Sequence, residues 1–191
     1  ACIEVGDGEI HALLGENGAG KTTLMNVLYG LYEKDSGEVY WNNELIEFNS
    51  PKDAIACKIG MVHQHFMLVS NLTVAENISL GLKSKGHPFP DKKYLNEEIR
   101  NISEKYELEV NPEALISSLS VGEQQRVEIL KLLYRDAKLL ILDEPTAVLT
   151  PNEISNFFKI LKKLKSLGHS VIIITHKIPE VQAITDKISV L

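Results

Sequence analysis

The sequence contains few cysteines and no long hydrophobic segment. Its 191 residues include two cysteines, Cys2 and Cys57, which stand far apart and belong to no Cys-x-x-Cys pair or Cys/His cluster. A structural zinc site and a disulfide framework are therefore not expected. The longest apolar runs cover residues 139–142 and 171–174, well below the roughly 18 residues of a membrane-spanning helix. The composition, with 44% hydrophobic and 24% charged residues, is typical of a globular protein.

Positive charge and targeting signals are also scarce. Lys and Arg total 20 against 26 Asp and Glu, a formal net charge of −6, which argues against a general nucleic-acid-binding surface. The first ten residues carry three acidic side chains and no basic stretch, so no signal peptide is expected. The chain lacks an initial methionine and has strand-like patterns at both ends. We therefore expect a fragment that is trimmed at both ends.

Short apolar runs alternate with helical patterns along the chain. Continuous apolar runs are typical of strands buried on both faces of a parallel sheet, and they occur at residues 10–14, 59–62, 138–142 and 171–174. Residues 151–167 repeat apolar side chains at helical spacing. This alternation predicts an α/β fold with a mainly parallel sheet. The pair Asn42-Asn43 between two alternating segments predicts a small antiparallel β-hairpin.

The middle of the chain differs from its flanks. From residue 73 to residue 134 the apolar spacing is mostly helical, and capping-box patterns begin at Thr73 and Ser120. Residues 83–92 contain two prolines and a glycine and predict an exposed loop. We expect one domain, 1–191, in which a helical subdomain, 73–134, is inserted into an α/β core made of 1–72 and 135–191.

A glycine-rich loop follows the first apolar run. Residues 15–22, GENGAGKT, fit the P-loop pattern GxxxxGK[ST], whose glycines let backbone N–H groups turn inward around phosphate oxygens. Lys21 is expected to reach the β- and γ-phosphates, and Thr22 to offer its hydroxyl to Mg²⁺. The alternative is an ordinary strand-to-helix turn with three glycines. The predicted phosphate contacts come from Gly15, Asn17, Gly18, Ala19, Gly20, Lys21, Thr22 and Thr23.

A second motif is an apolar strand that ends in two carboxylates. The run LLILDE at 139–144 fits a Walker B element, in which Asp143 holds Mg²⁺ directly or through water. Glu144 would stand beside the γ-phosphate and orient or deprotonate the attacking water. The alternative is a strand that simply ends in acidic turn residues before Pro145. The P-loop in the same chain favours the nucleotide site.

A third motif lies between the first two. The run LSVGEQQR at 119–126 resembles the LSGGQ signature of ATP-binding cassette (ABC) ATPases, with departures at two positions. The resemblance implies a P-loop NTPase fold and a second anion site, which grips the γ-phosphate bound to an opposite cassette. A well-capped amphipathic helix without this function would carry the same capping box. The predicted signature residues are Ser120, Val121, Gly122, Glu123 and Gln124.

Two further positions match the family by their order in the chain. Gln64 aligns with the Q-loop glutamine, which the resemblance associates with Mg²⁺, water and coupling to the membrane partner. His176 aligns with the switch histidine that contacts the γ-phosphate. His63 and His65 lack a third ligand nearby and are interpreted as loop residues. The resemblance thus implies the catalytic residues Glu144, His176, Lys21 and Gln64, and the metal ligands Thr22, Gln64 and Asp143.

The resemblance narrows to the first cassette of bacterial simple-sugar and nucleoside importers. The most distinctive phrases are MVHQHFML at 61–68, which favours the nucleoside branch, and EPTAVLTP at 144–151. Where the family commonly has a D-loop aspartate, Thr150 begins another capping box and is expected to cap a helix. The family also stacks adenine on an aromatic residue before the P-loop, and none occurs between residues 1 and 15. We therefore expect weak nucleotide affinity in this chain.

The resemblance implies an ATPase with ATP and Mg²⁺ as cofactors, peripheral to the cytoplasmic face of the bacterial cell membrane. Its implied partners are permease subunits contacted through the Q-loop and residues 73–134, a second cassette in the same full-length chain and, indirectly, an extracytoplasmic solute-binding protein. Nucleic acid is not an expected partner.

Two rival functions remain at this stage. A non-transport ABC ATPase of DNA repair would carry a long coiled coil in the middle of the chain, and no sustained heptads occur here. A ribosome-associated member would lack a permease. An inactive, purely structural cassette is the second rival, and the intact set Lys21, Asp143, Glu144 and His176 argues against it.

Overall fold

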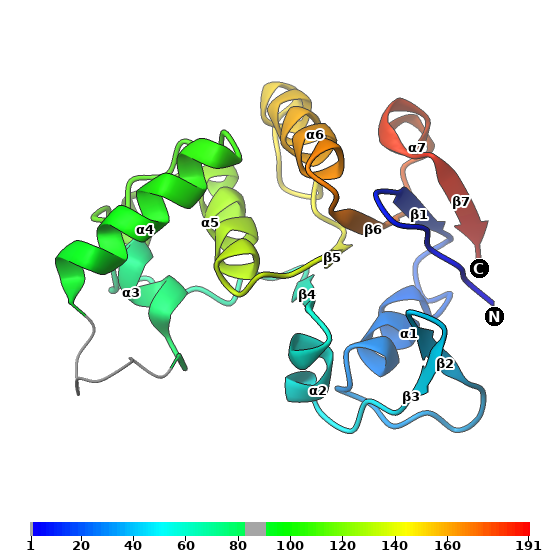
Figure 1. Ribbon diagram of the computed structural model, residues 1–191. Helices are drawn as coiled ribbons and strands as arrows, with labels where there is room; N and C mark the ends of the chain where they lie inside the picture. The colour runs from blue at the N-terminus through cyan, green and yellow to red at the C-terminus, as the bar shows by residue number, and fades with distance from the viewer. Residues whose placement is uncertain (1, 83–90) are drawn as a thin grey trace.

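A parallel β-sheet forms the centre of the molecule. In this computed structural model, which describes residues 2–82 and 91–191, five strands pair in the order β4-β5-β6-β1-β7, and every pairing is parallel (Figure 1). The strands are β1 (Ile10–Leu14), β4 (Ile59–Val62), β5 (Leu139–Asp143), β6 (Ser170–Thr175) and β7 (Lys187–Val190). The predicted α/β fold is confirmed. Most of the loop predicted at 83–92 lies outside the described residues.

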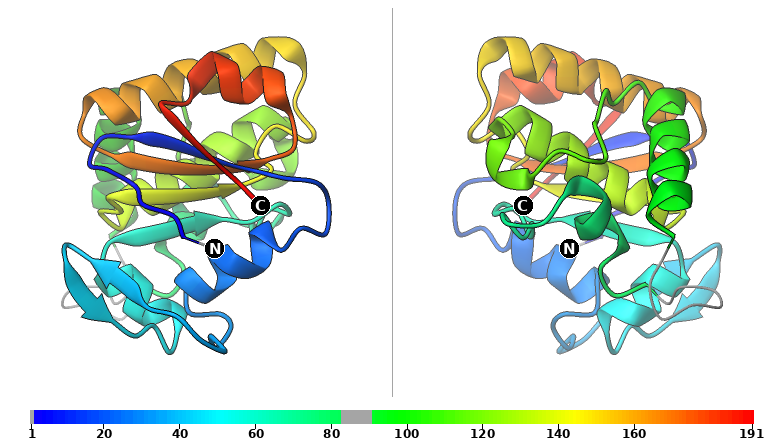
Figure 2. Two further views of the ribbon diagram at one scale, coloured as in Figure 1. Left: turned by 90° about the vertical axis from the view of Figure 1, so that its right-hand side faces the viewer. Right: turned by 90° about the vertical axis from the view of Figure 1, so that its left-hand side faces the viewer.

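Helices cover both faces of the sheet. On one face lie α6 (Pro151–Ser166) and α7 (Ile178–Ile184), and on the other α1 (Lys21–Leu28) and α2 (Pro51–Ala56) (Figures 1 and 2). Successive side chains of a strand point to opposite faces. Leu140 and Leu142 of β5 accordingly join one hydrophobic cluster, while Leu139 and Ile141 join the other. Burial on both faces explains why these strands are continuously apolar.

The hairpin forms where the asparagine pair predicts it. Strands β2 (Val39–Trp41) and β3 (Glu44–Ile46) pair antiparallel, with Trp41 opposite Glu44. Asn42 and Asn43 between them have φ values of 51° and 64°. Two consecutive positive φ angles define the turn type that matches the twist of paired strands, and asparagine tolerates this conformation better than most residues.

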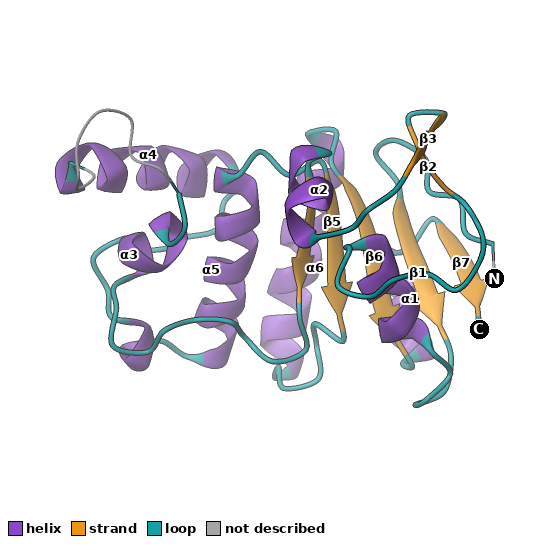
Figure 3. Cartoon of the chain, turned by 90° about the horizontal axis from the view of Figure 1, so that it is seen from below, coloured by secondary structure: helices purple, strands orange, loops and turns teal. Residues whose placement is uncertain are grey.

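The helices of the middle segment lie beyond the β4 edge of the sheet (Figure 3). They are α3 (Val74–Ser79), α4 (Lys92–Lys105), the short 3-10 helix η1 (Ile116–Ser118) and α5 (Val121–Tyr134). Both predicted capping boxes form: the hydroxyls of Thr73 and Ser120 accept from the backbone N–H three residues later, and the glutamate there accepts from the cap residue's N–H. The hydroxyl and the carboxylate thus satisfy free helix N–H groups at each start.

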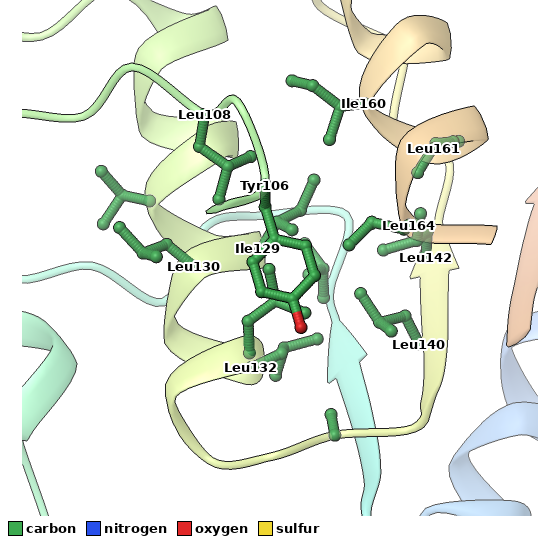
Figure 4. Packing of buried hydrophobic residues seen from close by; sticks show 14 of the residues in the cluster. Tyr106, Leu108, Ile129, Leu130, Leu132, Leu140, Leu142, Ile160, Leu161 and Leu164 are labelled. Atoms are coloured by element: carbon green, nitrogen blue, oxygen red, sulfur yellow. The ribbon is translucent and has the colours of Figure 1, made fainter. Parts of the chain in front are cut away.

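Helix α5 is fixed to the sheet by the larger hydrophobic cluster. Ile129 and Leu132 of α5 meet Leu140 and Leu142 of β5 and the apolar face of α6 in this cluster (Figure 4). Tyr106, which follows α4, lies in the same cluster, and its hydroxyl pairs with the buried His169 Nε2 at 3.0 Å. Because most residues of α5 from Gln125 to Leu133 are buried, the core fixes the direction of this helix and so the place of its N-terminus at Ser120.

Candidate active site

The motifs predicted from the sequence gather at one edge of the sheet. Strands β1, β4, β5 and β6 all run in the same direction, so their carboxyl ends meet at the edge shown at the bottom of Figure 3. The segments that follow these ends carry the P-loop, Gln64, the carboxylate pair and His176. Ligands of open α/β sheets commonly bind outside this edge.

The P-loop connects β1 to α1, and its lysine folds back over it. Gly18 and Gly20 have φ values of 85° and 91°, a conformation that glycine adopts without steric cost. Lys21 is 5% exposed, and its Nζ donates to the carbonyl oxygens of Gly15 at 2.9 Å and Glu16 at 2.8 Å. The ammonium is thus held at the loop itself, where it would meet an anion cradled by the backbone N–H groups.

Thr22 and Asp143 join the P-loop helix to β5. Thr22 Oγ1 donates to Asp143 Oδ1 at 3.3 Å. Asp143 is 3% exposed, and burial raises the pKa of its carboxyl; the hydrogen bond from Thr22 opposes this shift, and the charge of Glu144 adds to it. Within the described residues no three His, Cys, Asp or Glu side chains cluster as a metal site. The hydroxyl and carboxylate nevertheless fit Mg²⁺, which prefers oxygen ligands and takes others from phosphates and water.

Glu144 and His176 form the second contact at this edge. They follow different strands, yet Glu144 Oε1 and His176 Nδ1 lie 2.9 Å apart. Glu144 has a φ of 46°, and its N–H donates to the carbonyl of Ile174 at 3.0 Å. A positive φ at a residue with a side chain is uncommon and tends to occur at functional sites. Here the residue with the positive φ is Glu144, whose carboxylate contacts His176.

Gln64 follows β4, the strand next to β5, and its side chain is exposed. The two flanking histidines differ from each other. The ring of His63 meets the ring of Tyr29 edge-on, with centroids 6.3 Å apart, whereas His65 is exposed. The contact with Tyr29 gives His63 a packing role in the loop.

The signature residues are not brought to the P-loop of the same chain. Helix α5, which they begin, lies well apart from α1 (Figures 1 and 3). Ser120 and Glu123 engage each other in the capping box, and Gln124 Nε2 donates to the carbonyl of Leu119 at 3.1 Å. Val121 is exposed at the start of the helix.

The segment after Walker B confirms the predicted cap and reveals a contact that sequence reasoning missed. Thr150 caps α6 through a capping box with Glu153. A Cβ atom on Gly122 would lie 2.6 Å from Glu153 Oε1, so a larger residue there would push the Glu153 side chain out of its place in the capping box. The backbone of Gly122 also helps to hold the pKa of the Glu153 carboxyl low, after the hydrogen bonds from Thr150. The starts of α5 and α6 are therefore in direct contact.

Other polar groups near the site were also missed by the sequence reasoning. The buried Gln125 donates to the carbonyl of Pro145 at 2.6 Å, and Thr146 Oγ1 donates to Glu180 at 2.6 Å. Glu128, buried on α5, accepts from the N–H of Met67 at 2.6 Å. One signal for Glu128 was present in the sequence, because a single acidic residue interrupts the apolar run Val127–Leu130. A buried charge in such a run requires a partner.

Comparison with known proteins identifies the family. The family model described as "ABC transporter" matches residues 2–147, and the chain belongs to this family. A solved nucleotide-free ATP-binding cassette from an ABC transporter superposes with a TM-score of 0.87 at 28% identity, covering 99% of this chain and 79% of that one. The cbiO1 protein of Clostridium perfringens, part of an ABC transporter complex, gives 0.83 at 32% identity over 98% and 75%.

Several relatives are named as import ATP-binding proteins. The chain is 54% identical to the nucleoside import ATP-binding protein NupA of Lactococcus lactis and to the guanosine import ATP-binding protein NupO of Bacillus subtilis, over 99% of its length and 37% of theirs. It is 46% identical to the glucose import ATP-binding protein TsgD13 of Haloferax volcanii, over 99% of this chain and 40% of that protein. The resemblance to nucleoside and sugar importer ATPases is confirmed, and the chain spans less than half the length of these relatives.

Proposed function

We propose that this chain is the ATP-binding and ATP-hydrolysing cassette of an ABC importer for nucleosides or simple sugars. The proposal rests on the carboxyl edge of the sheet, where Asp143, the last residue of β5, contacts Thr22 and the next residue, Glu144, contacts His176. The relatives named for nucleoside, guanosine and glucose import support an importer. They lend no support to an ATPase of DNA repair or of the ribosome.

In this proposal the P-loop binds the phosphates. The backbone N–H groups of residues 15–20 and the N-terminus of α1 attract the anion, and Lys21 exchanges its two carbonyl partners for phosphate oxygens. Thr22, Asp143 and Gln64 are the proposed contacts for Mg²⁺, which supplies neutralising charge at the phosphates when bound.

Glu144 is the proposed general base. Its carboxylate orients the attacking water and accepts a proton from it, while the contact with His176 Nδ1 fixes the carboxylate and frees the other ring nitrogen for the γ-phosphate. Most of the rate enhancement then comes from positioning and from charges that are already in place.

We further propose that ATP is bound between two cassettes. The separation of α5, which begins after Ser120, from α1, which follows the P-loop, supports a signature that reaches ATP on an opposite P-loop. The greater length of the relatives leaves room for a second cassette in the full-length chain. In this arrangement, residues 1–191 form one cassette and residues 73–134 its helical subdomain.

The remaining partners follow from the importer role. Permease subunits would contact the Q-loop and residues 73–134, and a solute-binding protein outside the cell would deliver solute to them. In the described residues no helix is both long and apolar enough to cross a membrane. We therefore propose a peripheral position at the cytoplasmic face, held by the permease.

The test uses the full-length protein assembled with its permease in vesicles. Glu144→Gln removes the base but keeps the shape of the side chain, so hydrolysis should fall by at least about 100-fold, while ATP still binds. Phosphate release and nucleotide binding are measured in parallel, and uptake of labelled nucleoside is compared with uptake of glucose. Glu44→Gln, on the exposed strand β3 and outside the proposed permease contact, serves as the control. Hydrolysis retained by Glu144→Gln would refute the role of Glu144.

A further inference from the structure

Helix α5 carries polar residues three apart that contact different loops of the site. Gly122 contacts Glu153 at the start of α6, and Gln125 donates to the carbonyl of Pro145 after Walker B. Glu128 and Lys131, one and two turns further on, contact the segment that follows Gln64. Successive members of this series, three residues apart, are neighbours on the helix surface. Glu128 and Lys131 lie farthest from the signature residues, and the function proposed above does not explain their contacts.

Glu128 and Lys131 hold both polar groups of a single residue. Glu128 Oε1 accepts from the N–H of Met67 at 2.6 Å, and Lys131 Nζ donates to the carbonyl oxygen of Met67 at 3.2 Å. The two side chains also pair with each other, Lys131 Nζ to Glu128 Oε2, at 3.1 Å. Met67 is thus gripped at its backbone by an ion pair on α5.

The burial of Glu128 shows that this contact has a cost. Glu128 is 3% exposed, and the residues before and after it in α5, Val127 and Ile129, are fully buried. Removing a carboxylate from water is expensive, and well-packed apolar residues often stabilise a fold at least as well as a buried ion pair. The benefit of Glu128 must therefore lie in fixing the position of its partner.

The orientation of Met67 agrees with a positional role. Its backbone is held against α5, but its side chain is 63% exposed. A residue held for core packing would turn its apolar side chain inward. Met67 follows Gln64 by three residues, so the two contacts that hold the Met67 backbone also restrict the position of Gln64.

We propose that Glu128 and Lys131 are positioning residues that connect the Q-loop, here residues 64–67, to α5, the helix that the signature residues begin. Through Met67 they make Gln64, at one end of the loop, and Ser120, at the start of α5, move together. A force applied to the exposed side of the Q-loop is therefore transmitted to the signature. The proposal deepens the importer function and rests on it, because a permease is the partner that would supply this force.

The test replaces the pair together in the full-length protein assembled with its permease. The double variant Glu128→Leu with Lys131→Met removes both charges at once, so that no unpaired charge is buried. Hydrogen exchange at the amide of Met67 should become about tenfold faster, since a bond to a charged acceptor is lost. Permease-stimulated kcat should fall about tenfold, whereas KM for ATP should stay within about twofold, because Lys21 and Thr22 belong to other elements.

Two control variants separate positioning from stability. Leu133→Ala destabilises α5 in the core and leaves Glu128 and Lys131 in place, and Lys131→Arg keeps the donor and the charge. Leu133→Ala should lower the melting temperature but preserve Met67 exchange and the stimulated kcat, and Lys131→Arg should preserve both.

The outcomes distinguish this inference from the proposed function. Unchanged Met67 exchange or unchanged stimulated kcat in the double variant would overturn the inference, as would an equal loss of kcat in Leu133→Ala. A wild-type protein without hydrolysis or without stimulation would overturn the proposed function instead. In that case hydrogen exchange at Met67 alone decides whether the pair holds the Q-loop.

Discussion

At the scale of single residues, Asp143 meets two opposing demands. Its carboxylate is suited to a metal ion, but it is 3% exposed, and burial raises its pKa. A raised pKa means that the ionised form is less stable in the folded protein than in the unfolded chain. Without Mg²⁺ the ionised Asp143 therefore weakens the fold, and this penalty disappears as the pH falls below the folded-state pKa.

We predict that Asp143→Asn stabilises the metal-free protein at pH 7. The amide keeps an oxygen for the Thr22 hydrogen bond and removes the buried charge, so the melting temperature of this cassette should rise by about 2–4 °C, as expected for ~1 kcal/mol in a domain of this size. The gain should shrink in acidic buffer, where the wild-type carboxyl is already neutral. Differential scanning calorimetry of the full-length protein with a chelator measures both effects, and ATP hydrolysis should be lost.

A second aspartate provides a control of opposite sign. The hydrogen bond from Lys58 lowers the pKa of Asp136, against a smaller effect of burial. Its side chain is exposed, so the stabilisation from the pair is small. Asp136→Asn should leave the melting temperature unchanged or slightly lower at pH 7. A rise equal to that of Asp143→Asn would show that general charge reduction, and not burial, explains the effect.

At the scale of elements, the starts of α5 and α6 depend on each other. Glu153 accepts from Thr150 in its own capping box, and its side chain also lies against Gly122 of α5. The starts of α5 and α6 therefore both contact the side chain of Glu153. This contact gives a structural reason for glycine at position 122, independent of any contact with nucleotide.

We predict that Gly122→Ala changes stability in opposite directions in two backgrounds. With Glu153 present, the new Cβ would stand 2.6 Å from its Oε1, so the melting temperature should fall. With Glu153→Ala the space is free, and alanine, a better helix former than glycine by about 1 kcal/mol, should raise it. Thermal unfolding of the four proteins forms a double-mutant cycle. Equal effects of Gly122→Ala in both backgrounds would exclude the proposed contact.

The elements show where sequence reasoning succeeds and where it stops. The apolar runs at 59–62 and 139–142 predicted buried strands correctly, because a strand covered on both faces leaves no other choice of residue. The capping boxes at Thr73, Ser120 and Thr150 were also predicted, since they involve residues only three apart.

Contacts between distant segments escaped the sequence. Helical spacing shows that Glu128 lies near buried residues of α5, but it does not reveal that the N–H of Met67 stands opposite. The same holds for Gln125 and Pro145, which are 20 residues apart. Such contacts depend on how α5 packs against the sheet, which periodicity alone does not determine.

At the scale of the whole molecule, net charge is a poor guide to the ligand. The chain has a formal charge of −6, yet in the proposed function its P-loop holds an anion through oriented N–H groups, a helix N-terminus and one buried lysine. These groups are all local to residues 15–22. The affinity proposed for them is for phosphates, and it does not depend on the nucleobase.

We predict that the chain of residues 1–191 binds ATP and inorganic triphosphate, each with Mg²⁺, with dissociation constants within about fivefold of each other. Stacking of a base on an aromatic residue is worth about 1–3 kcal/mol. No aromatic residue occurs between residues 1 and 15, so ATP gains no such contact there. Isothermal titration calorimetry measures both constants. Lys21→Ala should weaken both by a similar factor, since the lysine acts on phosphate oxygens that the two ligands share. ATP binding that is clearly more than about fivefold tighter than triphosphate binding would mean that residues of this chain recognise adenine, against the prediction.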